Sequence, residues 1–132
     1  MTTQVASNLH VPDWWLGSLP EWLVYRELAR LGKRDGEHFT YQSPLMGGRI
    51  QRGGVIIDFL FYDPPDLAIN VQGVYWHYGL GPEVIARDRI ARAQLAGQGL
   101  TLIFIDEDDL MRNPRHYVEE ALQYRDHSQM QE

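Results

Sequence analysis

Asp58 is the residue whose position most strongly suggests chemistry. It lies in the middle of the apolar stretch VIIDFLFY (55–62), and no basic residue is near it in the sequence. A carboxylate inside a buried strand is costly unless it is paired, protonated or bound to a cation. Two interpretations of Asp58 therefore stay open: a strand-end carboxylate that pairs with an arginine or a backbone N–H, or a metal ligand.

Gln72 could supply a second oxygen ligand beside Asp58. It ends the stretch LAINVQ (67–72), which the turn DPPD (63–66) joins to the Asp58 strand. If these strands pair through that turn, the two side chains come close, and oxygen ligands on adjacent strands suit a hard cation such as Mg²⁺. Gln72 shares a strand face with Asn70, so the alternative is an ordinary polar residue on a solvent-facing side.

A histidine and another carboxylate follow in the chain. His77 stands in INVQGVYWHYG (69–79), and Asp88 follows it in ARDRIARAQL. His77 could act as a general base near neutral pH, and Asp88 could orient the imidazole by accepting its second N–H. The alternative for His77 is a surface histidine, and the alternative for Asp88 is an exposed charge on a helix.

Glu21 has two explanations. The pattern SLPE (18–21) is typical of a capping box, with Ser18 as the cap and Glu21 three residues later. Glu21 also borders the apolar stripe of the helix that follows, so it could face the sheet and reach a metal. Glu27 flanks the other side of that stripe, and we prefer Glu21.

The elements that must position these residues follow from periodicity and turn signals. We expect an apolar helix stripe of Val24, Leu28 and Leu31. The predicted elements are a helix at 18–32, a strand at 37–45, a glycine-rich turn at 46–54, strands at 55–62 and 67–72, a helix at 81–99, a strand at 100–105, an acidic loop at 106–112 and a helix at 113–125.

This order predicts an α/β fold: a single domain at 18–125 with a mixed sheet flanked by helices. The apolar strand 100–105 is typical of the centre of a sheet. We expect the N-terminal segment 1–17 to dock on the domain through its apolar part, 11–17, and the polar tail 126–132 to fray.

The composition excludes several classes of protein. The chain of 132 residues has no cysteine, one lysine and a net charge of −6. Disulfides and cysteine-based zinc sites are therefore excluded, and the charge argues against a general nucleic-acid coat protein. No apolar run is long enough to cross a membrane, and no signal peptide is evident. We expect a cytoplasmic protein with no membrane partner.

Three blocks of the sequence resemble the PD-(D/E)XK nuclease superfamily, and most of all its very-short-patch repair endonuclease branch. The blocks are GGVIIDFLF, INVQGVYWH and ARDRIARAQLAGQGLTLIFIDEDDL, and the resemblance covers residues 18–112. It implies a restriction-endonuclease-like α-β-β-β-α-β core, to which 113–125 adds a C-terminal helix. The implied activity is hydrolysis of DNA phosphodiester bonds with Mg²⁺ or Mn²⁺, and RNA stays open as a substrate.

The resemblance also implies roles for single residues. Asp58, the carbonyl of Val71 and the first-helix acid Glu21 would hold the metal. His77 would be the catalytic histidine with Asp88 as its support, and Gln72 would stand at the acid of the acid-x-lysine pattern. Tyr75 and Trp76 match aromatics that wedge into DNA, or they pack over the sheet edge. Phosphates could be contacted by Arg49, Arg52, Arg87 and Arg89, each otherwise a solvated charge.

The chain departs from the family pattern in ways that favour a second interpretation. Val74 stands where the pattern has lysine, and the repair branch has histidine at the position of Gln72. The zinc ligands of the mismatch enzymes are missing, so mismatch specificity is not implied. The alternative is a nuclease fold that has lost its chemistry and serves as an adaptor in a larger assembly, such as a phage particle. In that case the 11–17 segment could bind a protein partner, and the virion would be a second location.

Overall fold

The computed structural model of the protein describes residues 10–41, 50–52, 55–73 and 82–130. Along the chain the elements are α2 (Leu19–Arg30), β1 (Phe39–Tyr41), β2 (Ile50–Arg52), β3 (Val55–Ile57), β4 (Phe59–Phe61), β5 (Leu67–Gln72), α4 (Pro82–Gly97), β6 (Thr101–Asp106), α5 (Glu107–Arg112) and α6 (Pro114–Leu122).

The main sheet has four strands in the order β1-β4-β5-β6. β4 is antiparallel to β1 and to β5, whereas β5 and β6 are parallel and are joined through α4. A parallel pair needs such a helical crossover, so the predicted α/β class with a mixed sheet and flanking helices is confirmed. β2 and β3 form a separate antiparallel pair.

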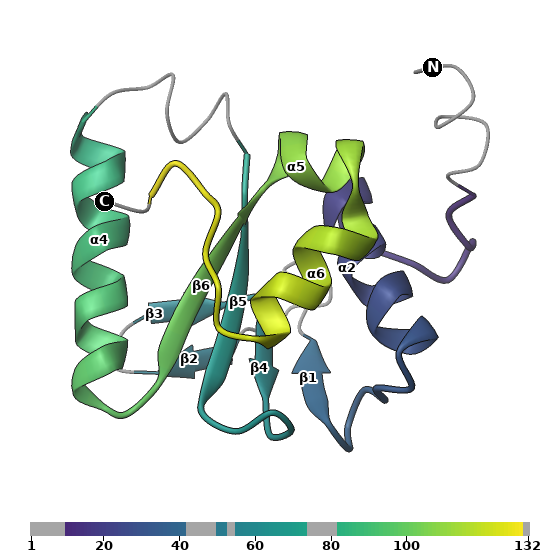
Figure 1. The fold of residues 1–132 in the computed structure, drawn as a ribbon, viewed down its shortest axis with the longest axis horizontal. Helices are drawn as coiled ribbons and strands as arrows, with labels where there is room; N and C mark the ends of the chain where they lie inside the picture. Colours follow the sequence, from purple (N-terminus) through teal and green to yellow (C-terminus); the bar gives the residue numbers. More distant parts are fainter. Residues whose placement is uncertain (1–9, 42–49, 53–54, 74–81, 131–132) are drawn as a thin grey trace.

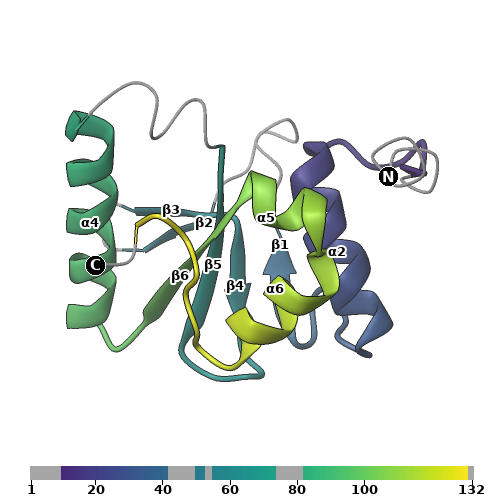
Figure 2. The ribbon, with the colours of Figure 1, turned by 45° about the horizontal axis from the view of Figure 1, so that its top comes forward.

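Two apolar clusters lie on the two faces of the sheet. Helices α2, α5 and α6 cover one face, and α4 covers the other, as Figures 1 and 2 show. The first cluster contains Leu23, Leu28, Phe39, Phe59 and Ile69 among others. The second contains Leu60, Leu95, Leu102 and Phe104. These faces follow from strand alternation, since Phe59 and Leu60 are neighbours in β4 but join different clusters.

The predicted strand 55–62 is broken at Asp58. β3 ends at Ile57 and pairs with β2, and β4 begins at Phe59 and pairs with β1 and β5. Val55 and Ile57 join the second cluster while Ile56 is 41% exposed. Strict alternation over 55–62 would place Ile56, Asp58 and Leu60 on one face. The structure does not do so, because the alternation shifts by one residue at Asp58.

Two predicted loops contain regular structure. Ile50–Arg52 is strand β2 in the predicted turn 46–54, where residues 46–49 and 53–54 lie outside the described part. The predicted acidic loop 106–112 is helix α5, apart from Asp106, which ends β6. Its first turn carries three acidic residues, which the N-terminal end of a helix dipole favours, and Leu110 anchors it in the first cluster.

Helix α2 keeps most of its predicted stripe. Val24 and Leu28 are fully buried, but Leu31 is 41% exposed because the helix has ended at Arg30. Trp15 of the N-terminal segment packs in the first cluster, donates its indole N–H to the Ser18 carbonyl at 3.0 Å and stacks on Tyr41. The helices among the described residues lack the combination of length and apolarity that a membrane span needs.

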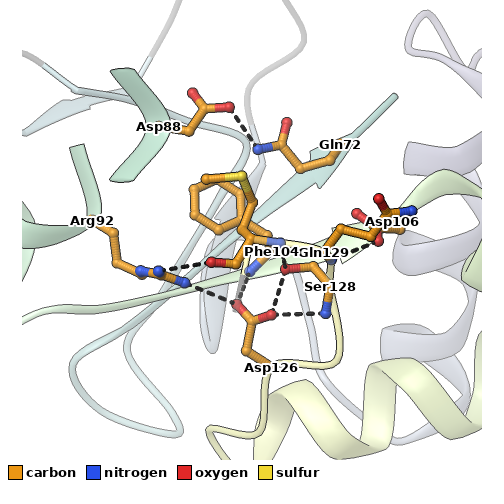
Figure 3. A network of polar contacts seen from close by, with 9 residues as sticks. Gln72, Asp88, Arg92, Phe104, Asp106, Asp126, Ser128 and Gln129 are labelled. Carbon is orange, nitrogen blue, oxygen red and sulfur yellow. Dashed lines mark hydrogen bonds and ion pairs between the residues drawn. The ribbon is translucent and has the colours of Figure 1, made fainter. Parts of the chain in front are cut away.

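β6 is an edge strand of the four-stranded sheet, not a central one as predicted. The C-terminal segment 126–130 lies beside it and takes up its polar groups (Figures 1 and 3). The Phe104 N–H donates to Asp126 at 2.9 Å, and the Gln129 N–H donates to Asp106 at 3.0 Å. Met130 is fully buried in the second cluster. The expectation that these residues fray is wrong, because the strand edge and the cluster both need a cover.

Met130→Ala should therefore destabilise the protein by about 2–4 kcal/mol, the usual effect of emptying a buried methionine site. Urea denaturation followed by circular dichroism measures this. Gln129→Ala is the matched control, because Gln129 is exposed and bonds Asp106 through its backbone. Equal free energies of unfolding for the two variants would contradict the packing of this segment.

Candidate functional site

Asp58 is fixed by two residues of β5 at the point where β3 and β4 diverge. The Asp58 N–H donates to Asn70 Oδ1 at 2.8 Å, and Asn70 Nδ2 donates to the Ile56 carbonyl at 3.0 Å. The Val71 N–H donates to Asp58 Oδ2 at 2.9 Å. Side chains thus replace the ladder bonds that the break removes, and they hold the Asp58 carboxylate rigidly beside β5.

The structure brings Asn70, and not Gln72, next to Asp58. The predicted pairing of the two strands through the DPPD turn is present, and its register sets Phe59 opposite Ile69. Continued by one residue, this register leads from Asp58 to Asn70. Counting outward from the predicted turn 63–66 would instead set Asp58 opposite Val71, so the turn alone does not give this pair.

The carbonyl of Val71 lies on the same side of β5 as Asp58. In an extended strand the N–H and the C=O of one residue point to the same side, and the Val71 N–H points at Asp58. The Val71 carbonyl and the Asp58 carboxylate are thus two oxygen donors at the same end of the sheet.

Glu21 forms only half of the predicted capping box. Its N–H donates to Ser18 Oγ at 3.2 Å, but its carboxylate accepts a 2.6 Å hydrogen bond from the Tyr41 hydroxyl on β1. Gly17 permits this contact, since a Cβ there would overlap the Tyr41 hydroxyl. The Glu21 carboxylate therefore faces the sheet, and capping alone does not explain the residue.

Asp58 and Glu21 form a pair of like charges. Burial, and then the negative charge of Glu21, raise the pKa of Asp58 to about 7, although the hydrogen bond from Val71 lowers it. Close carboxylates cannot both ionise cheaply unless a cation or a shared proton offsets the repulsion. This donor set of two carboxylates and one carbonyl fits a hard divalent cation.

Gln72 is buried and belongs to the α4 side of the sheet. Its side chain is 2% exposed, and its Nε2 donates to Asp88 Oδ2 at 2.8 Å (Figure 3). The solvent-facing interpretation of Gln72 is therefore wrong: the face that it shares with Asn70 is the one that α4 covers. Asp88 is fixed by Gln72, and its predicted partner His77 lies outside the described residues.

The structure gives few contacts for the predicted nucleic-acid-binding residues. Arg49, Tyr75 and Trp76 also lie outside the described part of the chain, and Arg52 is described only by its backbone in β2. Arg87 and Arg89 are exposed on α4.

Asp106 is a further carboxylate near the site, and the sequence predicts it to lie in a loop. It is 4% exposed, ends β6 opposite Gln72 and accepts the bond from Gln129. The carboxyl ends of parallel strands are where open α/β sheets gather their functional groups, and recognising Asp106 as a strand end would have revealed it.

Comparison of the chain with protein-family models, with curated proteins and with solved structures finds no match.

Asp58→Asn should change how stability depends on pH. The folded state holds the Asp58 proton up to about pH 7 and the unfolded chain only to about pH 4, so the native protein loses stability as pH rises between these values. The difference corresponds to at most roughly 4 kcal/mol. We expect Asp58→Asn to lack this loss and to be the more stable protein at pH 8 without divalent cations.

Denaturant titrations of both proteins from pH 4 to pH 8, in a chelating buffer, measure the difference directly. Comparing the two proteins at each pH cancels the other titrating groups. Parallel curves across this range would mean that Asp58 carries no penalty in the fold.

Proposed function

We propose that this chain is an endonuclease of the PD-(D/E)XK type, which hydrolyses DNA phosphodiester bonds with Mg²⁺ or Mn²⁺. The observation that carries the proposal is the Asp58 carboxylate, locked beside β5 and repelled by Glu21, with a pKa raised to about 7. A fold that tolerates such a charge pair gains from a cation that offsets it.

The β4–β5 register supports a different placement of the acid-x-lysine pattern on the chain. Asn70 is opposite Asp58, so the acid-x-lysine pattern would fall on Asn70, Val71 and Gln72, two residues earlier than the sequence alone suggests. The middle residue is then Val71, whose carbonyl lies on the Asp58 side. Amides occupy both outer positions, where the pattern has an acid and a lysine.

In this mechanism the chain positions a metal and a phosphate. Asp58, Glu21 and the Val71 carbonyl would hold the cation, which when bound supplies Lewis-acid polarisation of the scissile phosphate. Tyr41 keeps the Glu21 carboxylate turned to the sheet, and Asn70 keeps the Asp58 backbone in place. His77 would take the proton of the attacking water.

Nucleic acid would be held by local basic groups, because the net charge of −6 gives no general attraction to phosphate. Arg87 and Arg89 on α4 are exposed, and together with Arg49 and Arg52 they are our candidates for phosphate contacts. DNA is the proposed substrate on the resemblance alone, and RNA would use the same contacts.

Two observations favour the adaptor as a second candidate function. Amides occupy both outer positions of the proposed pattern, which reduces the charge available to a cation. Trp14 is 63% exposed next to the buried Trp15 and Trp22, with ring centroids 6.2 and 5.7 Å away. An exposed tryptophan on a rigid aromatic base is typical of protein contact sites.

Asp58→Asn should abolish Mg²⁺ binding and lower the rate of nicking of supercoiled plasmid by at least about a hundredfold. Calorimetry and gel electrophoresis measure the two effects. Asp108→Asn is the control, because Asp108 is an exposed acid of α5. If the wild-type protein neither binds Mg²⁺ nor nicks DNA, the adaptor function is the better description.

Asn70→Asp should strengthen Mg²⁺ binding by about tenfold or more, because it adds a carboxylate beside Asp58 while keeping the oxygen that accepts the Asp58 N–H. Gln72→Glu is the matched comparison, and it should destabilise the protein by opposing the Asp88 carboxylate. If Gln72→Glu binds Mg²⁺ more tightly and Asn70→Asp does not, the acid of the acid-x-lysine pattern falls on Gln72, as the sequence alone predicts, and not on Asn70.

A further inference from the structure

A second group of potential metal ligands lies on α6, apart from the Asp58 site. His116, Glu120 and His127 each offer one ligand atom, and these atoms all lie within 4.8 Å of one another. His116 and Glu120 are one turn apart on the same face of α6. His127 comes from the C-terminal segment that covers β6, so the group joins two parts of the chain.

The backbone around these ligands is well fixed. The His116 N–H is capped by Asn113 Oδ1 at 3.2 Å in the first turn of α6. Asp126, the neighbour of His127, accepts bonds from Phe104 and Ser128 (Figure 3). Tyr117 packs edge-on against both imidazoles, at centroid distances of 4.9 and 5.8 Å.

Glu120 is an ionised acceptor with one oxygen engaged. His127 Nε2 and Arg125 Nε each lie 2.9 Å from its Oε1. These bonds, the one from Arg125 above all, lower the pKa of Glu120 to about 2. The hydrogen bonds that Glu120 accepts from described side chains all fall on Oε1, which leaves Oε2 for another cation. Glu120 and Arg125 also border a hollow of about 560 Å³.

We propose that His116, Glu120 and His127 form a binding site for a transition-metal cation such as Zn²⁺, Ni²⁺ or Co²⁺. Two imidazoles and one carboxylate are a donor set that these ions prefer, whereas Mg²⁺ prefers oxygen ligands such as those near Asp58. Three protein ligands leave one position for water.

The site would act as a structural clasp. A cation bound to α6 through His116 and Glu120, and to the C-terminal segment through His127, ties that segment down next to Asp126. The segment in turn covers β6 and buries Met130 in the second cluster. Metal binding therefore stabilises the folded chain, since the unfolded chain does not hold the three ligands together.

Zn²⁺ titration of the 132-residue chain by calorimetry, paired with thermal unfolding, tests the site. We expect one Zn²⁺ per chain and a higher unfolding temperature with Zn²⁺ present. His116→Gln and His127→Gln should each weaken Zn²⁺ binding by about tenfold or more and remove the thermal shift. His10→Gln, at an exposed histidine of the N-terminal segment, is the matched control and should behave as the wild-type protein does.

Arg125→Gln gives a test in the opposite direction. It removes the cation that now engages Glu120, so Zn²⁺ should bind several-fold more tightly to it than to the wild-type chain. Asp58→Asn should keep the wild-type Zn²⁺ affinity, which separates this site from the nuclease proposal. Absence of Zn²⁺ binding to the wild-type protein, or unchanged binding to His127→Gln, would overturn the clasp.

Discussion

The break in the chain at Asp58 is the constraint on which the rest of the structure depends. Before it, Val55 and Ile57 face the cluster under α4, and after it Phe59 faces the cluster under α2. One residue thus lets a continuous apolar stretch serve two cores. The cost is a set of backbone groups without ladder partners, and the side chain of Asn70 and the carboxylate of Asp58 satisfy them.

The same break places chemistry at the carboxyl end of the parallel pair. The negative charge of Glu21 on α2 acts on Asp58, and Gln72 bonds Asp88 on the α4 side, so the functional candidates are divided between the two faces of one sheet. The C-terminal segment covers the edge of the sheet at β6. The two proposed cation sites belong to different parts of this arrangement and differ in ligand chemistry, so each can be tested without the other.

The sequence predicts the long elements and misses the short ones. The helix from Pro82 follows from the proline near its start and the glycines near its end, and the strand Leu67–Gln72 follows from its apolar residues and the turn before it. The sequence predicts loops at strand β2 and helix α5, because three residues with arginine and glutamine, or a run of acids, carry no local periodicity. Contacts with other parts of the chain stabilise both elements: β3 pairs with β2, and the first cluster buries Leu110.

The sequence by itself determined the α/β order, the cap at Ser18, the polar turn at DPPD and the exceptional position of Asp58, because these depend on local propensity and on the cost of a carboxylate among apolar residues. Only the tertiary structure decided that Asn70 is beside Asp58, that Gln72 is buried, that Glu21 bonds Tyr41 and that the C-terminal segment covers an edge strand. Those facts depend on register and on contacts between residues far apart in the chain, and local pattern does not encode either of them.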